Sequence, residues 1–311
     1  MEKILITGIE GFVGHHLTFH LLKRGYEVFG FHLLPVREPF PEVRYFQCDI
    51  LDFEKLPSLL KEIKPDGIFH LAAVSSVGYS FTHPEETLRV NFIGTYHLLR
   101  ALLLSSLSPR IILISSADVY GRVRDKKPIK ESYPLNPISP YGISKLLAEE
   151  CGKIFQKAKG LDIVILRPFN HIGIGQREDF VFPYCARRIA EIEKGISRNP
   201  LFLGNIDVQR DYLDVWDVVD AYEKALRFGK GGEIYNVATG KPIRIRDGVN
   251  FLISLAKKPI KISIRKERKR KYDIPYLSGD PKKFQKETGW QPKRDIKETL
   301  RDLLNYYRHQ I

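Results

Sequence analysis

Tyr141 and Lys145 stand four residues apart in the segment 139–145, SPYGISK. On a helix this spacing places both side chains on one face. A lysine ammonium beside a phenol stabilises the phenolate and lowers the pKa of the phenol. Such a tyrosine exchanges a proton with an alcohol or ketone while hydride moves to or from a nicotinamide ring. Ser116, which follows an apolar run at 110–115, offers a helper hydroxyl, so the pattern indicates a site that oxidises an alcohol or reduces a carbonyl.

A glycine-rich segment, GIEGFVG at 8–14, lies between a short apolar run and a helical pattern. In a dinucleotide site the first glycine permits a tight turn, the second lets backbone approach a pyrophosphate, and the third lets the helix pack on the strand. Free N–H groups at the start of that helix attract the phosphates. Three ordinary turn glycines are the alternative. The position directly after an N-terminal apolar run favours the dinucleotide site, to which we assign Gly8, Gly11, Phe12, Val13 and Gly14.

The residues after the second apolar run bear on the choice of dinucleotide. An NAD site usually carries a carboxylate there, which accepts hydrogen bonds from the ribose hydroxyls and repels a 2′-phosphate. The run at 28–32 ends in His32, Arg37 follows, and no acid occurs before Glu38. This favours NADP(H) with NAD(H) possible, unless Arg37 is a solvated loop residue. Asp49 is placed to accept from the adenine amino group, or else it caps a helix predicted at 53–63.

Strand-like and helix-like runs alternate over the first 166 residues. The predicted strands are 3–7, 27–31, 43–47, 67–71, 110–115 and 162–166, and the predicted helices are 12–24, 53–63, 84–107 and 140–158. Continuous apolar runs are typical of strands buried on both faces. The alternation predicts an α/β fold with a Rossmann-type doubly wound parallel sheet, which binds ligands beyond the carboxyl ends of its strands.

The pattern loosens after Arg167. We predict helices at 181–195, 214–228, 245–256 and 295–308, and strands at 200–204, 233–237 and 261–264. These elements are expected to form a smaller C-terminal α+β lobe. The predicted cofactor domain spans 1–166 plus about 208–238, and the predicted substrate lobe spans 167–207 and 239–311.

Composition excludes several classes of protein. With 43% hydrophobic residues the 311-residue chain is not disordered, and it has no apolar run near twenty residues. The N-terminus does not resemble a signal peptide, so we expect a cytoplasmic protein. Cys48, Cys151 and Cys185 form no CxxC pair, which argues against disulfides and a cysteine zinc site. The net charge of +13 attracts anions, and nucleotide phosphates account for it as well as nucleic acid does.

Three other features favour ordinary structural explanations. His15, His16 and His20 are interpreted as a polar helix face, so no metal site is expected. The basic run 265–271 lacks interleaved aromatic residues and is interpreted as a solvated edge with one functional arginine, which argues against a nucleic-acid partner. The apolar stretch 98–103 is core, or it helps form a dimer interface.

Taken together, the motifs resemble those of the extended short-chain dehydrogenase/reductases (the NAD-dependent epimerase/dehydratase family) that act on nucleotide sugars. The resemblance covers nearly the whole chain and rests on 8–14, 70–73, 90–95, Ser116, Tyr141 with Lys145, and 167–170. It implies that Ser116, Tyr141 and Lys145 are catalytic. It also implies a cofactor site that includes Ile50, Leu71, Ala72, Ala73, Asn91 and Pro168, and substrate contacts from Ser75, Ser76, Asn170, Arg210 and Arg270. An arginine fork suits a diphosphate.

Segments 169–176, 190–195 and 203–206 resemble the branch that acts on GDP-mannose derivatives, although Ile174 stands where proline is usual. The resemblance implies that Phe180, Val181, Arg187 and Asn205 line the GDP site. It also implies a homodimer formed through a helix bundle.

Two reactions of this branch fit the sequence best. Ser116 favours NADPH-dependent reduction of the C4 ketone of a GDP-6-deoxyhexulose. Asp118 keeps the GDP-mannose 4,6-dehydratase reaction open, because that elimination needs an acid or base besides the tyrosine, while Ala117 weakens this alternative. A nucleotide-sugar 4-epimerase is a third possibility. A non-catalytic NADP-binding relative with a regulatory or RNA-binding role is a different class, which the intact Ser116, Tyr141 and Lys145 argue against.

Overall fold

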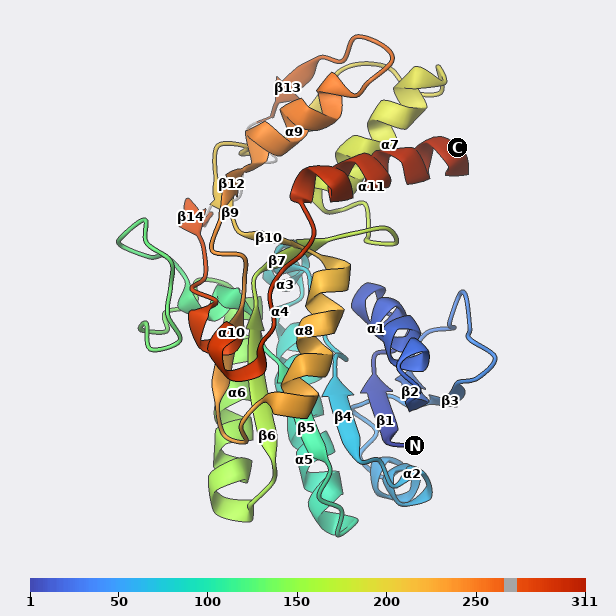
Figure 1. The fold of residues 1–311 in the computed structure, drawn as a ribbon, viewed down its shortest axis with the longest axis vertical. Coiled ribbons are helices and arrows are strands. Elements are labelled where there is room, and N and C mark those ends of the chain that lie inside the picture. The colour runs from blue at the N-terminus through green and yellow to red at the C-terminus, as the bar shows by residue number, and fades with distance from the viewer. Residues whose placement is uncertain (266–272) are drawn as a thin grey trace.

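The computed structural model of the protein describes residues 1–265 and 273–311. Its centre is a seven-stranded sheet in the order β11-β6-β5-β4-β1-β2-β3, with every neighbouring pair parallel (Figure 1). The strands are β1 (Lys3–Thr7), β2 (Glu27–His32), β3 (Arg44–Gln47), β4 (Gly67–His70), β5 (Arg110–Ile114), β6 (Ile163–Pro168) and β11 (Ile234–Val237). The strand order reverses between β1 and β4, which is where doubly wound sheets bind ligands. The predicted Rossmann-type sheet is confirmed.

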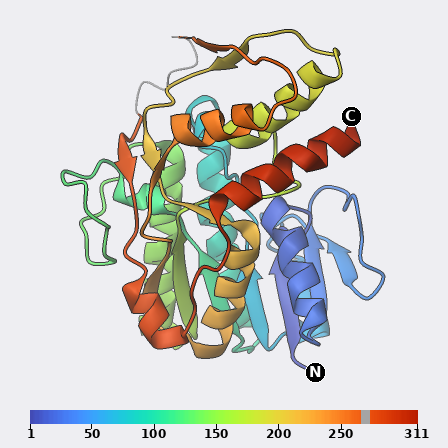
Figure 2. The same cartoon turned by 45° about the horizontal axis from the view of Figure 1, so that its top comes forward.

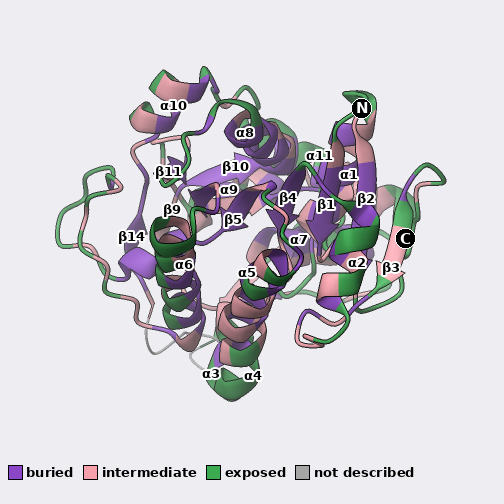
Figure 3. Cartoon of the chain, turned by 90° about the horizontal axis from the view of Figure 1, so that it is seen from below, coloured by how far each residue is buried: buried purple, intermediate pink, exposed green. Residues whose placement is uncertain are grey.

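Helices cover both faces of this sheet, so its strands are buried on both sides, except for the partly exposed edge strand β3 (Figure 3). Residues Ile4 and Ile6 of β1 pack with α1 (Phe12–Lys23) and α8 (Val215–Phe228), whereas Leu5 packs with α2 (Leu56–Ile63) and α5 (Gly94–Leu104). This division follows from the alternation of side chains along a strand. Helix α6 (Pro140–Lys159) packs against α5 on the second face.

Local sequence sets the start and end of α6. The Ser139 hydroxyl accepts a hydrogen bond from the Gly142 N–H at 3.0 Å, and Pro140 occupies the first turn. At the other end Gly160 adopts φ 72°, a left-handed conformation that favours glycine. The N-terminal cap therefore fixes the turn that carries Tyr141.

The helix predicted over 84–107 is present over 84–104, and its interior contains a turn that was not predicted. The structure has α4 (Pro84–Leu88), a π-helical turn η1 (Arg89–Ile93) and then α5 without a break. Inside the π turn, the Asn91 side chain accepts from the Val74 N–H at 2.8 Å and donates to the Ser144 hydroxyl at 2.9 Å. A widened turn adds one residue without changing the apolar pattern much, so periodicity did not reveal it.

A smaller group of elements lies beyond the carboxyl ends of the sheet strands (Figures 1 and 2). It consists of α7 (Val181–Glu193), β8 (Leu201–Leu203), β9 (Gln209–Arg210), β12 (Ile243–Arg244), α9 (Ile245–Ser254), β13 (Ile262–Ile264), β14 (Tyr276–Leu277) and α11 (Ile296–Gln310). The three helices share a core of their own with β8. Short elements went unpredicted because they span too few residues to show a period: β7 (Asn170–Ile172), β10 (Tyr212–Asp214), α3 (Val77–Thr82), η2 (Ala117–Tyr120) and α10 (Lys282–Thr288).

A buried ion pair joins α6 to β6. Arg167 donates from Nε to Glu149 Oε1 at 2.9 Å and from Nη2 to Glu149 Oε2 at 2.6 Å, and both side chains are almost fully buried. Arg167 also donates to the Tyr120 hydroxyl at 3.0 Å, and the Ser115 hydroxyl donates to Glu149. The network ties the strands that precede Ser116 and Asn170 to the helix that carries Tyr141.

Other expectations from composition can be checked directly. Among the described residues no helix is long and apolar enough to span a membrane. The three cysteines are free and buried. Leu98, Leu99 and Leu102 are buried between α5 and the sheet, so they are core residues.

Candidate active site

One groove, with a volume of about 1970 Å³, runs between the carboxyl ends of the sheet strands and the smaller group of elements. It is lined by the glycine loop after β1, the segment after β4, Ser116 after β5, and Tyr141 and Lys145 of α6. The structure therefore brings the predicted phosphate loop and the predicted catalytic side chains into the same groove.

The glycine loop is a close-fitting cradle. Gly8 has φ +71°, and a Cβ there would lie 2.8 Å from the Ala72 Cα. A Cβ at Gly14 would lie 2.6 Å from the Gly8 carbonyl oxygen. Helix α1 begins after Gly11 with no side-chain cap and no acidic residue in its first turn, so its N–H groups remain suited to an anion. These features fit a dinucleotide pyrophosphate.

A buried chain of hydrogen bonds holds the segment after β4 against this loop. The Thr7 hydroxyl accepts from the Ala72 N–H at 3.2 Å and lies 2.8 Å from His70 Nδ1. His70 Nε2 lies 3.0 Å from the Thr95 hydroxyl, which itself donates to the Asn91 carbonyl. Burial lowers the pKa of His70 to about 3, so the ring is neutral and donates from Nε2 while Nδ1 accepts. The chain fixes the backbone of 71–73 beside the glycines.

Tyr141 and Ser116 lie at the centre of the groove. Tyr141 is only 8% exposed. The Ser116 hydroxyl accepts from the Asp118 N–H at 3.1 Å and lies 3.3 Å from Asp118 Oδ2. Asp118 is thus both a turn residue of η2 and a carboxylate that lines the groove.

The expected lowering of the Tyr141 pKa is not found. Burial first, and then the Asp118 charge, raise the pKa of Tyr141 well above its ordinary value, while a hydrogen bond with Ser116 opposes the shift. The Lys145 ammonium instead donates to the Ile114 carbonyl oxygen at 2.8 Å. Tyr141 therefore keeps its proton in this structure, as a proton donor must.

Burial lowers the pKa of Lys145 to about 8, an effect that the nearby Glu149 carboxylate opposes. An unfolded lysine keeps its proton up to its ordinary value of 10.5. Between these values the unfolded chain binds more protons than the folded chain, so the lysine's contribution to the unfolding free energy rises with pH.

We therefore expect the unfolding free energy of the parent chain to rise by about 2–3 kcal/mol relative to that of Lys145→Met between pH 7 and pH 10. Denaturant unfolding of both chains at each pH measures the difference, and all other titrating groups cancel to first order. A gap that stays constant with pH would contradict the shifted pKa of Lys145.

Most of the predicted binding residues line the groove. Those assigned to the cofactor are Gly8, Gly11, Phe12, Val13, Gly14, Arg37, Asp49, Ile50, Leu71, Ala72, Ala73 and Pro168, and those assigned to the substrate are Ser75, Ser76, Asn170, Phe180, Val181, Asn205 and Arg210. Asp49 accepts from the Leu51 N–H at 2.9 Å, and α2 begins only at Leu56, so the helix-cap alternative is wrong.

Three of the predicted residues that the structure describes do not line it. His32 Nδ1 pairs with the Leu34 carbonyl at 3.0 Å. Asn91 is buried, and its side chain accepts from the Val74 N–H and donates to the Val74 carbonyl oxygen. Arg187 does not line the groove either, because it pairs with Glu178 and Glu191. Arg270 lies outside the described residues.

Among the groove residues that were not predicted from the sequence, two have carboxylates that bear on binding. Asp273 accepts from Arg210 Nη2 and from Asn205 Nδ2, each at 3.1 Å, and so links two predicted substrate residues. No motif marks it. Glu10 occupies the middle of the glycine loop, where its position alone could have drawn attention to it.

The histidines of α1 differ from the predicted polar face. His16 is buried, and its ring lies 4.7 Å from the Trp216 ring between centroids. His20 Nε2 lies 2.9 Å from Glu223 Oε2, close to Asp220. Arg24 lies 3.6 Å and Arg227 3.5 Å from the same Glu223 carboxylate, so arginines already neutralise this cluster and do not favour a metal ion.

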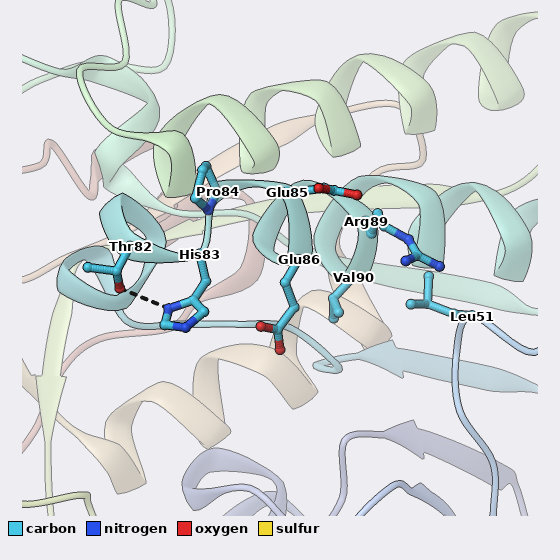
Figure 4. Close-up of a pocket in the computed structure, with 8 residues that line it drawn as sticks. All are labelled: Leu51, Thr82, His83, Pro84, Glu85, Glu86, Arg89 and Val90. Atoms are coloured by element: carbon cyan, nitrogen blue, oxygen red, sulfur yellow. Dashed lines mark hydrogen bonds between the residues drawn. The ribbon is translucent and has the colours of Figure 1, made fainter.

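A smaller pocket of about 440 Å³ adjoins the groove beside α4 (Figure 4). Its lining residues are Leu51, Thr82, His83, Pro84, Glu85, Glu86, Arg89 and Val90. The His83 Nδ1 pairs with the Thr82 hydroxyl at 2.8 Å (Figure 4). None of the predicted catalytic residues lines this pocket.

Comparisons with known proteins agree with this geometry. The family model described as GDP-mannose 4,6 dehydratase matches residues 5–303. The chain is 36% identical to GDP-6-deoxy-D-mannose reductase of Pseudomonas aeruginosa, over 100% of this chain and 98% of that one. It is 30% identical to GDP-mannose 4,6-dehydratase of Yersinia enterocolitica, over 98% and 93%.

Solved structures extend the comparison. A structure of RMD from Pseudomonas aeruginosa complexed with NADPH matches with a TM-score of 0.88 and 35% identity, covering 100% of both chains. A Thermus thermophilus UDP-glucose 4-epimerase complexed with NAD matches with a TM-score of 0.90 and 28% identity, covering 99% of this chain and 100% of that one.

The fold and groove thus define a Rossmann-type dinucleotide-dependent enzyme of the extended short-chain dehydrogenase/reductase class. Within that class, the chain belongs to the GDP-mannose 4,6-dehydratase family.

Proposed function

We propose that this chain is an NADPH-dependent reductase that converts the C4 ketone of a GDP-6-deoxyhexulose, as in GDP-4-keto-6-deoxy-D-mannose, to an alcohol. The observation that carries the proposal is the groove itself, which brings the buried Tyr141 and Ser116 together with the glycine loop. Similarity to GDP-6-deoxy-D-mannose reductase over the full chain supports the choice of substrate.

Several residues of the chain have separate roles in the proposed reduction. The bound nicotinamide supplies a hydride. Tyr141 donates the proton that the carbonyl oxygen needs, and Ser116 orients that oxygen by hydrogen bonding. The Lys145 ammonium donates to the Ile114 carbonyl oxygen. From this position it would bind the nicotinamide ribose. Asn91, which donates to the Ser144 hydroxyl one turn from Tyr141, positions the start of α6.

The diphosphate of the substrate is assigned to the part of the groove that Arg210 and Asn205 line. Arg210 is 11% exposed at its side chain and lines the groove beside Asn205. Its guanidinium suits a diphosphate, which would compete with Asp273 for it. Phe180 and Val181 at the start of α7 contribute apolar surface there.

The preferred cofactor is NADP(H), and NAD(H) remains possible. A relative of this chain is complexed with NADPH, and a more distant one with NAD. Arg37, exposed on the loop after β2 and lining the groove, suits a 2′-phosphate.

The 4,6-dehydratase is the second candidate, because Asp118 lines the groove next to Ser116. Its carboxylate already interacts with the Ser116 hydroxyl. The reductase is placed first because the chain is 36% identical to a GDP-6-deoxy-D-mannose reductase and 30% identical to a GDP-mannose 4,6-dehydratase.

The two candidates separate in one assay. GDP-mannose and its 4-keto-6-deoxy derivative are each incubated with and without NADPH, and the products are identified by mass. We expect the keto sugar to be consumed only with NADPH, and GDP-mannose to remain unchanged. Loss of water from GDP-mannose without added reductant would identify a dehydratase instead.

We also propose a homodimer in the cytoplasm. Large apolar side chains are exposed on α5 and α6, namely Leu104, Ile143, Leu147 and Ile154. Adjacent exposed apolar residues on two neighbouring helices suit burial against a second copy. Light scattering on the purified chain should give twice the mass of 35.9 kDa, and a monomer at micromolar concentration would contradict the dimer.

A further inference from the structure

Glu10 has a carboxylate that the chain satisfies on one side only. Its Oε1 accepts from the Leu33 N–H at 3.0 Å and from the Leu34 N–H at 3.4 Å. Its Oε2 is buried and has no hydrogen-bond partner among the described residues. Glu10 nevertheless lines the groove together with Gly8 and Gly11.

A buried carboxylate oxygen without a donor costs free energy, so its retention calls for an explanation. The position of Glu10 supplies one. It bridges the glycine loop and the two residues that follow β2, which is the region where a doubly wound sheet holds the adenosine ribose of a dinucleotide. A ribose hydroxyl there would donate to Oε2 and satisfy it.

We propose that Glu10 accepts a hydrogen bond from the 2′-hydroxyl of the adenosine ribose and is the residue that limits this enzyme's preference for NADPH over NADH. The carboxylate usually found at the end of β2 is absent, because His32 stands there and pairs with Leu34. Glu10 supplies the missing acid from the preceding loop. A 2′-phosphate would approach the same carboxylate and be repelled, while Arg37 would attract it.

Glu10 and Arg37 therefore act in opposite directions on one atom of the cofactor. With both present, the chain binds both dinucleotides, and the ratio of their affinities depends on the balance of the two charges. The inference concerns cofactor binding and does not depend on which sugar is reduced.

The variant that isolates the effect is Glu10→Gln, since its amide oxygen still accepts from Leu33 and Leu34. Isothermal titration calorimetry gives Kd for NADPH and for NADH without any sugar. We expect the ratio Kd(NADH)/Kd(NADPH) to rise by about tenfold or more, because a negative charge beside the phosphate is lost and a donor is gained. Arg37→Gln should move the same ratio in the opposite direction.

Glu42→Gln is the matched control, because Glu42 is exposed on the loop that carries Arg37, has the same charge as Glu10 and does not line the groove. It should leave the ratio within about twofold of the parent chain. A Glu10→Gln ratio equal to that of Glu42→Gln would overturn the proposal and leave Glu10 as a residue that only holds the loop.

A measurement on the unmodified chain tests the same contact without a variant. ADP and 2′-deoxy-ADP differ only in the hydroxyl assigned to Glu10, and we expect the deoxy compound to bind several-fold more weakly. Equal affinities would also overturn the proposal. If the affinity ratio shifts as expected but no sugar is reduced, the proposed function fails while the role of Glu10 stands.

Discussion

Tyr141→Phe should lower kcat for reduction of the 4-keto sugar by about a hundredfold or more, the usual contribution of a positioned proton donor. The hydroxyl is the only group removed, and the buried ring, 8% exposed, keeps its packing. Removal of the group that protonates the carbonyl oxygen slows the chemical step but leaves the glycine loop intact. The Kd for NADPH should therefore change little, and steady-state kinetics with calorimetry measure both quantities.

Tyr306→Phe is the matched control for this variant. Tyr306 also lines the groove, but it lies on α11, whereas the proposed reaction centre is formed by α6 and the segment after β5. Its hydroxyl has no part in the proposed step, so kcat should stay close to that of the parent chain. Equal losses in the two variants would show that the effect on Tyr141 is not specific to proton donation.

Arg167→Met should reduce the unfolding free energy by about 3–5 kcal/mol, since it leaves Glu149 as an unpaired buried charge. Arg167 and Glu149 are 1% and 0% exposed, and two charge-assisted hydrogen bonds join them. The variant also removes donors from the Tyr120 hydroxyl and the Glu131 carbonyl. Denaturant unfolding followed by circular dichroism measures the loss.

The double variant Arg167→Met with Glu149→Leu separates the missing partner from the missing packing. Replacing a buried ion pair by apolar residues of similar volume is often neutral. We expect the double variant to recover a large part of the stability that the single variant loses. A double variant that is less stable than the single one would contradict this interpretation of the pair.

The sequence predicted the sheet well because most of its strands are buried apolar runs, the edge strand β3 being the exception. The glycine loop was equally visible, since Gly8 needs a positive φ and Gly14 a close backbone contact that few other residues permit. The placement of Ser116, Tyr141 and Lys145 around one groove followed from the rule that carboxyl ends of parallel strands meet at one edge.

What the sequence did not predict depends on contacts between distant segments. The π turn at 89–93 contains Asn91, whose side chain forms hydrogen bonds with Val74 and Ser144. These two residues lie 17 and 53 positions away in the sequence. The raised pKa of Tyr141 reflects burial and the Asp118 charge, neither of which spacing on a helix reveals. Glu10 does not stand where a ribose ligand is expected, because the end of β2 is the usual position of the carboxylate that binds the ribose.

Isotope transfer tests whether hydride passes from the nicotinamide to C4 of a keto sugar. NADPH carrying deuterium in both positions at C4 of the nicotinamide is incubated with the 4-keto-6-deoxy GDP sugar and the purified chain. We expect a product that is one mass unit heavier than the product made with unlabelled NADPH, with the deuterium at C4 of the sugar. A product without deuterium, or with deuterium at another carbon, would show that the hydride does not pass to C4.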